Sequence, residues 1–256
     1  MKLSVALTPR LLRDPSANAV AVVDVLRATS SLVVMFDNGL LRAIVAENIQ
    51  KARRLALANF SLLCGEVKAL PPAGFDHGNS PADLSRVSFR GKSAVMMTTN
   101  GTRALAAAAQ APVAFAASLL NRRAAAERLL AGAARLKVDA AVVCAGNERG
   151  MTFSLEDTVA AGAIVEAARD IDPALHLADD AWAAFHLWRW YRGDLARAFR
   201  HSAHARALAK IGLERDLAYA AQLDVSRTVP VLQRDGDVAV LRARDPGKKR
   251  RAPARR

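Results

Sequence analysis

Four polar clusters in this sequence each follow an apolar run of the kind that forms a buried β-strand. Asp24 and Arg27 follow "NAVAVV", Glu66 follows "SLLCG", Thr98 to Thr102 follow "AVMM", and Asn147 follows "AAVVCAG". In an open α/β sheet, ligands bind beyond the carboxyl ends of the strands. If the four strands are parallel neighbours, the clusters converge on one edge of the sheet. This convergence predicts an active site there.

The segment 98–102, "TTNGT", joins an expected strand to an expected helix. Its glycine lets the backbone approach a ligand closely, and the free N–H groups of the following helix favour an anion. A phosphate or similar oxyanion is therefore the predicted ligand, with an ordinary helix N-cap as the alternative. The residues that could contact it are Thr98, Thr99, Asn100, Gly101, Thr102 and Arg103. The segment is not a Walker A loop, because that motif needs Gly-x4-Gly-Lys-Ser/Thr.

A long segment rich in turn-forming residues, "PPAGFDHGNSPADL" (71–84), separates the second and third clusters. Loops of this length are often functional. Asp76 could bind a metal ion, and Asn79 and Ser80 could contact an oxyanion. The alternative is a series of turns in which Asp76 only braces the backbone. His77 is expected to be a surface residue.

Mg²⁺ prefers oxygen ligands and usually keeps waters and a substrate phosphate in its shell. Besides Asp76, the carboxylates that could hold it are Asp24, Glu66, Glu156 and Asp157. Asp157 also fits a capping-box-like helix start with Ser154, and Glu156 also suits a helix N-terminus. Asp24, at the end of an apolar strand, needs a partner, and a structural pair with Arg27 is one alternative.

The two cysteines, Cys64 and Cys144, lie at predicted strand ends. A catalytic thiolate needs activation by a cation or a helix N-terminus. No Cys-x5-Arg loop is present, so buried structural thiols are expected. The histidines of the C-terminal half show no zinc-binding spacing. The aromatic cluster of Trp182, Trp188, Trp190 and Tyr191 indicates core packing or a subunit contact, which leaves a homo-oligomer open.

The pattern of elements indicates α/β layers around a largely buried sheet. Strands are expected at 18–25, 41–46, 60–66, 92–99, 112–117 and 138–146, several of them followed by helices. From about residue 154 the pattern is helical, and it ends in a hairpin over 228–243 with a turn at Asp235-Gly236. We expect one domain over residues 1–245 and a disordered basic tail over 246–256.

Composition excludes several classes of protein. No apolar run approaches the roughly 20 residues that span a bilayer, and the N-terminus lacks the pattern of a signal peptide. A soluble cytoplasmic protein without a membrane partner is expected. The net charge of +13 could indicate nucleic-acid binding, but six of the cations lie in the tail "GKKRRAPARR". Nucleic-acid binding is not expected as the main function.

Several stretches, in this order, resemble the 2-phosphosulfolactate phosphatase family over most of residues 20 to 232. They are "VVDVLRATSS", "CGE", "GFDHGNSP", "TTNGTRAL", "CAGNERGMTFSLEDTVAAG" and "SAHARALAKIGLERDLAYAAQLDVSRTVP". The resemblance implies a three-layer α/β/α fold with a largely parallel or mixed central sheet and a helical C-terminal half. It also implies Mg²⁺-dependent hydrolysis of 2-phospho-3-sulfolactate to 3-sulfolactate and phosphate, on the route to coenzyme M. After "CGE" the chain departs from the family, which usually continues with another glycine and polar residues, and reads "VKALPPAGFD" instead.

Together, the residues and the resemblance predict an Mg²⁺-dependent phosphomonoesterase acting on 2-phospho-3-sulfolactate or a related phosphorylated hydroxy acid. Asp24, Arg27 and Glu66 are the expected catalytic residues, with Arg149 or Arg103 as an added cation for a sulfonate or carboxylate. An aspartyl-phosphate mechanism with the Asp-x-Asp motif is disfavoured, because Leu26 stands two residues after Asp24. The alternative function is a non-catalytic binding protein for phosphorylated or sulfonated small acids.

Overall fold

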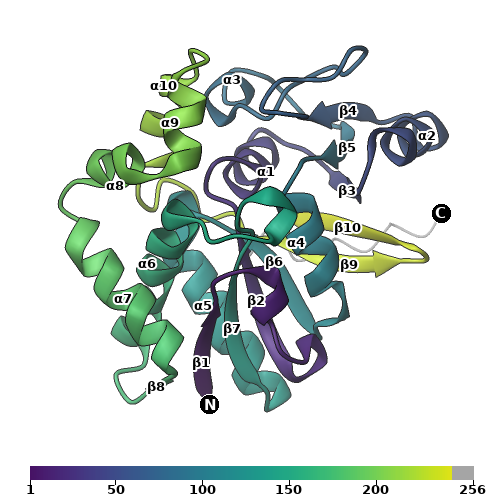
Figure 1. Cartoon of the computed structure of the whole chain (residues 1–256). Coiled ribbons are helices and arrows are strands. Elements are labelled where there is room, and N and C mark those ends of the chain that lie inside the picture. Colours follow the sequence, from purple (N-terminus) through teal and green to yellow (C-terminus); the bar gives the residue numbers. More distant parts are fainter. Residues whose placement is uncertain (244–256) are drawn as a thin grey trace.

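Ten strands form one mixed sheet in the computed structural model of the chain, which describes residues 1–243 (Figure 1). Their spatial order is β4-β5-β3-β10-β9-β6-β2-β7-β1-β8. The strands are β1 (Lys2–Ala6), β2 (Asn18–Val23), β3 (Arg42–Ala46), β4 (Leu62–Gly65), β5 (Ser93–Met97), β6 (Val113–Ala117), β7 (Asp139–Cys144), β8 (His176–Leu177), β9 (Pro230–Asp235) and β10 (Val238–Ala243).

The sheet consists of two parallel blocks that run in opposite directions. Strands β4, β5 and β3 are parallel to one another, and so are β6, β2, β7, β1 and β8. The hairpin β9–β10 lies between the blocks and is antiparallel to its neighbour on each side (Figure 1). Three successive antiparallel pairings reverse the strand direction between β3 and β6.

The condition set for the convergence of the four polar clusters, that their strands be parallel neighbours, is therefore not met. They form two parallel pairs, β2 with β7 and β4 with β5, that belong to opposite blocks. The reason is the C-terminal hairpin, because a strand pair from the far end of the chain enters the sheet between the two blocks.

Helices cover both faces of the sheet, and the side chains of β2 show this directly. Ala19, Ala21 and Val23 belong to one apolar core with α5 (Arg122–Leu136), α6 (Leu155–Ile171) and α7 (Asp179–Tyr191). Val20 and Val22 belong to a second core with α1 (Ala28–Asp37) and α4 (Gly101–Ala107). Alternate residues of a strand face opposite sides, so this division confirms the three-layer α/β/α arrangement.

The remaining helices are short or lie at the edges. They are α2 (Ile49–Asn59), which packs on β3 and β5, α3 (Pro81–Leu84), α8 (Leu195–His201), α9 (Ala203–Ala209) and α10 (Glu214–Ala220). The helical C-terminal half and the final hairpin were predicted and are confirmed; the hairpin register opposes Asp235 to Val238 across Gly236 and Asp237. Strands β1 and β8 were not predicted. The predicted basic tail, 246–256, lies outside the described residues.

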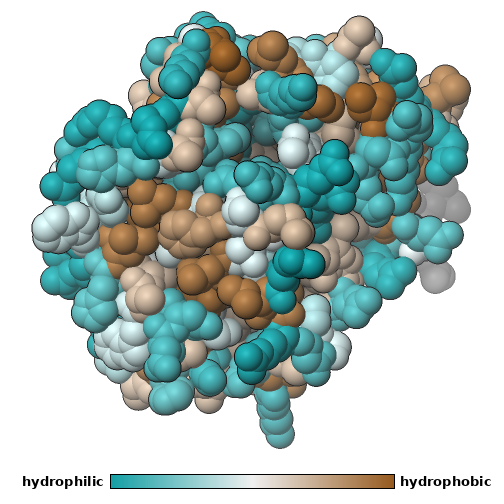
Figure 2. All heavy atoms as spheres, in the orientation of Figure 1, coloured by the Kyte–Doolittle hydropathy of each residue, from teal (hydrophilic) through white to brown (hydrophobic). Residues whose placement is uncertain are grey.

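The surface of the face drawn in Figure 1 is mixed. In the same orientation, hydrophobic side chains gather near its centre and left, and hydrophilic ones surround them (Figure 2). Over the part of the chain that the structure describes, no helix is both long and apolar enough to cross a membrane.

Candidate active site

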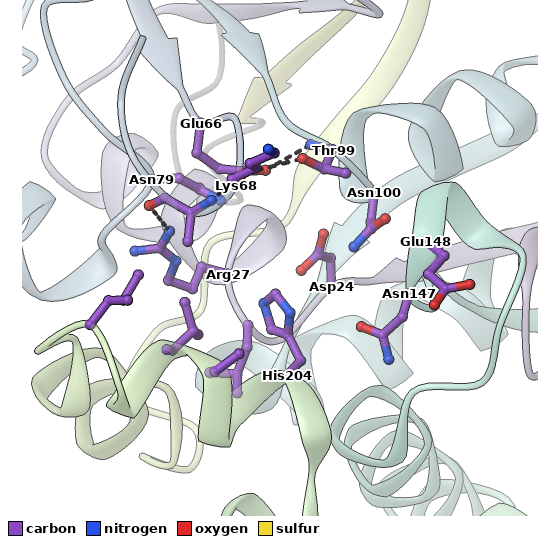
Figure 3. Close-up of a pocket in the computed structure, with 15 residues that line it drawn as sticks. Asp24, Arg27, Glu66, Lys68, Asn79, Thr99, Asn100, Asn147, Glu148 and His204 are labelled. Atoms are coloured by element: carbon purple, nitrogen blue, oxygen red, sulfur yellow. Dashed lines mark hydrogen bonds between the residues drawn. The ribbon is translucent and has the colours of Figure 1, made fainter.

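A cavity of about 440 Å³ lies where the segments after β2, β4, β5 and β7 meet helix α9 (Figure 3). One side of the cavity is apolar and is formed in part by Ala207, Leu208 and Ile211 of α9 and the turn beyond it. Its polar lining residues are Asp24, Arg27, Glu66, Lys68, Asn79, Thr99, Asn100, Asn147, Glu148 and His204. All four predicted polar clusters therefore contribute to one cavity, although their strands belong to two opposed blocks.

Asp24 occupies the turn between β2 and α1, and its backbone is fixed there. The Thr29 hydroxyl donates to the carbonyl oxygen of Asp24 at 2.8 Å, and the Ala28 N–H donates to its Oδ1 at 3.3 Å. Burial raises the pKa of the Asp24 carboxyl from 3.8 to about 6, although the charge of His204 and the Ala28 N–H act in the opposite direction. The nearby carboxylates of Glu66 and Glu156 raise the pKa further.

The loop at 98–102 closes against this carboxylate because residue 101 is glycine. A Cβ at Gly101 would lie 2.4 Å from Asp24 Oδ2 and 2.5 Å from Ala28 Cβ. Thr98 and Thr102 are buried and bond to each other, with the Thr102 N–H donating to Thr98 Oγ1 at 3.1 Å. Thr99 and Asn100 are the loop residues that line the cavity. The N-cap of α4, Asn100, makes no side-chain cap hydrogen bond, so Thr98 satisfies an N–H of the first turn instead, and the loop also forms one wall of the site.

Glu66 links two loops of the site. Its Oε1 accepts from the Thr99 N–H at 2.7 Å, and its Oε2 accepts from the Ala69 N–H at 2.8 Å and from the Thr99 hydroxyl at 3.2 Å. These three bonds hold the 98–102 loop against the turn that follows β4. Both carboxylate oxygens accept hydrogen bonds from the cavity wall, so the role that the structure shows for Glu66 is to stabilise that wall.

Arg27 is buried at the cavity wall, and its partner is Asp216 on α10. Arg27 Nη1 donates to Asp216 Oδ2 at 2.8 Å, and Nη2 donates to the Ala69 carbonyl at 2.6 Å. Asp216 also accepts from the Ser80 hydroxyl. Asp24 is therefore not the ion-pair partner of Arg27, and this alternative for the strand-end carboxylate is excluded. Sequence reasoning missed Asp216, although it lies within one of the stretches that carry the resemblance.

The segment 71–84 contributes one residue to the cavity and uses two others as structural supports. Asn79 is buried in the cavity wall, and its Oδ1 has no hydrogen-bond partner within residues 1–243. Ser80 caps α3 by accepting from the Asp83 N–H at 3.1 Å. Asp76 is exposed and accepts from the Leu63 N–H at 2.7 Å, away from the cavity lining.

Two predicted metal ligands lie behind Asp24 and outside the cavity lining. Asp157 accepts from the Val25 N–H at 2.9 Å and from the Gly146 N–H at 3.1 Å, which ties the ends of β2 and β7 together. Burial raises the pKa of Asp157 well above 3.8, and the charges of Asp24 and Glu156 add to the rise. Glu156 accepts from the Ser202 hydroxyl at 2.6 Å. Both carboxylates serve as internal acceptors.

Neither arginine predicted as an added cation lines the cavity. Arg103 and Arg149 are exposed, and only the backbone N–H of Arg149 reaches the site, by donating to Asn100 Oδ1 at 2.8 Å. The basic lining residues that sequence reasoning missed are Lys68 and His204. His204 was considered only for zinc-like spacing, and its signal was the stretch "SAHARAL". Lys68 lies in the segment that departs from the family.

The two cysteines have the environment of structural thiols. Both are buried, and burial raises the pKa of Cys64 to about 12 and that of Cys144 well above its ordinary value. A thiol that keeps its proton is a poor nucleophile.

The donor set suits a magnesium ion that also binds substrate, rather than a dedicated protein cage. Among residues 1–243, no group of three His, Cys, Asp or Glu side chains is placed to hold a metal ion. Mg²⁺ commonly uses one or two protein oxygens, several waters and a substrate phosphate. Asp24 and Asn79 both line the cavity, and the carboxylate of the first and the Oδ1 of the second, which has no hydrogen-bond partner within residues 1–243, are ligands of this type.

Comparison with known proteins identifies a family and several relatives. A model of the 2-phosphosulpholactate phosphatase family matches residues 6–235. A probable 2-phosphosulfolactate phosphatase of Symbiobacterium thermophilum is 38% identical over 223 residues, which cover 86% of this chain and 93% of the relative. Proteins of the same description from Thermotoga petrophila (36% identical, covering 82% and 87%) and Deinococcus radiodurans (38%, covering 85% and 88%) are also similar.

Proposed function

Because the chain belongs to the 2-phosphosulfolactate phosphatase family, we propose that it hydrolyses 2-phospho-3-sulfolactate or a related phosphorylated hydroxy acid with the help of Mg²⁺. Water attacks phosphorus, the ester P–O bond breaks, and the hydroxy acid and phosphate leave. One observation carries the proposal for the site: Asp24, Arg27 and Asn79 line one cavity, and the Oδ1 of Asn79 has no hydrogen-bond partner within residues 1–243. A place on the route to coenzyme M remains a prediction.

The buried groups at this cavity suit a phosphoryl group. Asp216 and the Ala69 carbonyl orient the Arg27 guanidinium, whose remaining N–H groups can bond phosphoryl oxygens. Because the Arg149 N–H bonds Asn100 Oδ1, the Asn100 side chain keeps its NH₂ group as a donor. Donors held in place before the reaction stabilise the charge that develops on phosphorus-bound oxygens without a reorganisation cost.

Asp24 and Asn79 would hold the Mg²⁺ ion. When bound, this ion neutralises phosphoryl charge and lowers the pKa of a coordinated water. His204 lines the same cavity close enough to lower the pKa of Asp24, and its imidazole can transfer a proton to the leaving oxygen. Glu66 keeps Thr99 and the turn after β4 in place during the reaction.

The test is phosphate release from a panel of 2-phosphohydroxy acids, with metal-stripped protein and with added Mg²⁺. We expect release only with the metal, and we expect Asp24→Asn to abolish turnover while the melting temperature shows that the fold is intact. Asp83→Asn is the control, since Asp83 is an exposed carboxylate on α3 that does not line the cavity. Tight binding of a panel member without phosphate release would instead support a non-catalytic binding protein.

A further inference from the structure

The turn that follows β4 has an unusual backbone for its sequence. Val67 and Leu70 exchange two backbone hydrogen bonds, at 2.9 Å and 3.2 Å, across a two-residue turn. The central residues, Lys68 and Ala69, both have positive φ, at 52° and 70°. A turn of the type I′ kind requires this conformation and favours Asn-Gly or Gly-Gly, because a side chain at positive φ is strained. Neither Lys68 nor Ala69 is of the favoured type.

This turn is fixed to the site from both sides. The Ala69 N–H donates to Glu66 Oε2 at 2.8 Å, and the Ala69 carbonyl accepts from Arg27 Nη2 at 2.6 Å. The direction in which Lys68 leaves the backbone is therefore set by two of the predicted catalytic residues. In the view of Figure 3, Lys68 lies with Glu66 and Asn79 on one side of the cavity and His204 lies on the other.

The charges of the residues that line the cavity favour an unpaired cation such as the Lys68 ammonium. Three lining residues, Asp24, Glu66 and Glu148, are carboxylates. The guanidinium of Arg27 is already paired with Asp216, whereas the ammonium of Lys68 makes no ion pair within residues 1–243. A substrate that carries acid groups besides its phosphoryl group would bring further negative charge into this cavity. Of the two basic lining residues without an ion pair in the described part of the chain, His204 acts on the charge of Asp24, which leaves the Lys68 ammonium to compensate for the added charge.

The cavity has a buried end and an exposed rim. Asp24, Arg27 and Asn79 are buried, whereas Lys68 is exposed and extends from the turn at the rim. A phosphoryl group held by the buried residues would place the rest of the substrate toward the rim. Resting on the proposed function, we propose that Lys68 determines specificity by binding a substrate acid group other than the phosphoryl group, a sulfonate or a carboxylate.

The test compares Lys68→Met with the wild type on three substrates. They are 2-phospho-3-sulfolactate, 2-phospholactate, which lacks the sulfonate, and 1-sulfopropan-2-yl phosphate, which lacks the carboxylate. A charge-assisted hydrogen bond lost from the bound state should raise KM by roughly tenfold or more, with a smaller effect on kcat. The increase should disappear with the substrate that lacks the group bound by Lys68, which identifies that group. Lys68→Arg should recover most of the loss.

Lys137→Met is the matched control, because Lys137 is also an exposed lysine at positive φ, at the end of α5 and away from the cavity. An equal rise in KM for all three substrates would place Lys68 at the phosphoryl group and overturn the proposal. An unchanged KM for all three would overturn it as well. Failure of the wild type to release phosphate from every substrate would instead refute the proposed function, so the two failures differ.

Discussion

Arg27 and Asp216 form a buried ion pair, with 2.8 Å between Nη1 and Oδ2, although 189 residues separate them in the sequence. Arg27 is the N-cap residue of α1 beside the cavity, and Asp216 lies on α10 in the helical C-terminal half. The same carboxylate accepts from the Ser80 hydroxyl and from the Ala82 N–H at 3.4 Å. Asp216 therefore joins the C-terminal helices, the segment 71–84 and the predicted catalytic arginine.

Replacing Asp216 with alanine should destabilise the protein strongly. The change leaves the buried guanidinium of Arg27 without its counterion, a loss that typically costs about 3–5 kcal/mol of unfolding free energy. Turnover should fall as well, because Arg27 loses the group that orients it. Urea unfolding followed by circular dichroism measures the first effect, and phosphate release in the absence of urea measures the second.

The control for Asp216 is Arg215→Gln, on the same helix. Arg215 pairs with Asp83 at 2.8 Å, but both side chains are about half exposed, and exposed pairs contribute only about 0–1 kcal/mol. An Asp216→Ala protein as stable as the Arg215→Gln protein would show that the buried pair does not hold these segments together.

Replacing Gly101 with alanine should damage the site through a steric clash. The new methyl group would lie 2.4 Å from Asp24 Oδ2 and 2.5 Å from Ala28 Cβ, so the loop must move away from the carboxylate. We expect a loss of about 1–3 kcal/mol in stability and a marked fall in kcat. Gly193→Ala is the control, because a Cβ there meets no atom within 4 Å. Equal activity of the two variants would contradict the close approach of Gly101 to Asp24.

The sequence allowed prediction of the layers and of most elements, because apolar strands and amphipathic helices have local signatures. It did not allow prediction of the sheet order. The hairpin over 228–243 looks the same in sequence at an edge of the sheet or between two blocks, and its place between β3 and β6 depends on long-range packing. For that reason the opposed directions of the β2–β7 and β4–β5 pairs were not foreseen.

The site residues show a similar division. Positions next to strand ends, such as Asp24 and Thr99, could be recognised because their polar side chains interrupt apolar runs, and both line the cavity. Asp216 and His204 lie on short helices that read as ordinary solvated segments. Sequence alone also offered no means to tell that Asp24 lines the cavity and Asp157 does not. The oxygens of both carboxylates accept hydrogen bonds from backbone N–H groups.

Replacing Asn79 with leucine should weaken the response to Mg²⁺. The unpartnered Oδ1 of Asn79 is the neutral oxygen ligand in the proposed metal site, and its loss should raise the Mg²⁺ concentration for half-maximal activity by about tenfold. Asn79→Asp puts a charged oxygen at the same place and should lower that concentration. Activity is measured by titrating Mg²⁺ into metal-stripped enzyme. The same Mg²⁺ midpoint in all three proteins would exclude Asn79 as a ligand.

Replacing Asp24 with asparagine should make the metal-free protein more stable at neutral pH. Burial raises the pKa of Asp24 to about 6 in the folded state, while an unfolded chain releases this proton near 3.8. Between these values the folded state binds the extra proton, so the free energy of unfolding falls as the pH rises. The loss is complete above the folded pKa and amounts to about 3 kcal/mol for a shift of this size. The asparagine side chain of the variant cannot ionise and therefore escapes this loss.

Urea unfolding of both proteins in EDTA, at pH values from 3.5 to 7.5, measures this difference. The stability of Asp24→Asn relative to the wild type should increase between about pH 4 and 6 and level off above that range, as linkage requires. Added Mg²⁺ should reverse the order at pH 7.5, because a cation bound at Asp24 stabilises only the wild type. If the difference in stability between the two proteins does not change with pH, the Asp24 carboxyl is not the buried titrating group. If added Mg²⁺ does not reverse the order of stability, the result counts against Asp24 as a ligand of Mg²⁺.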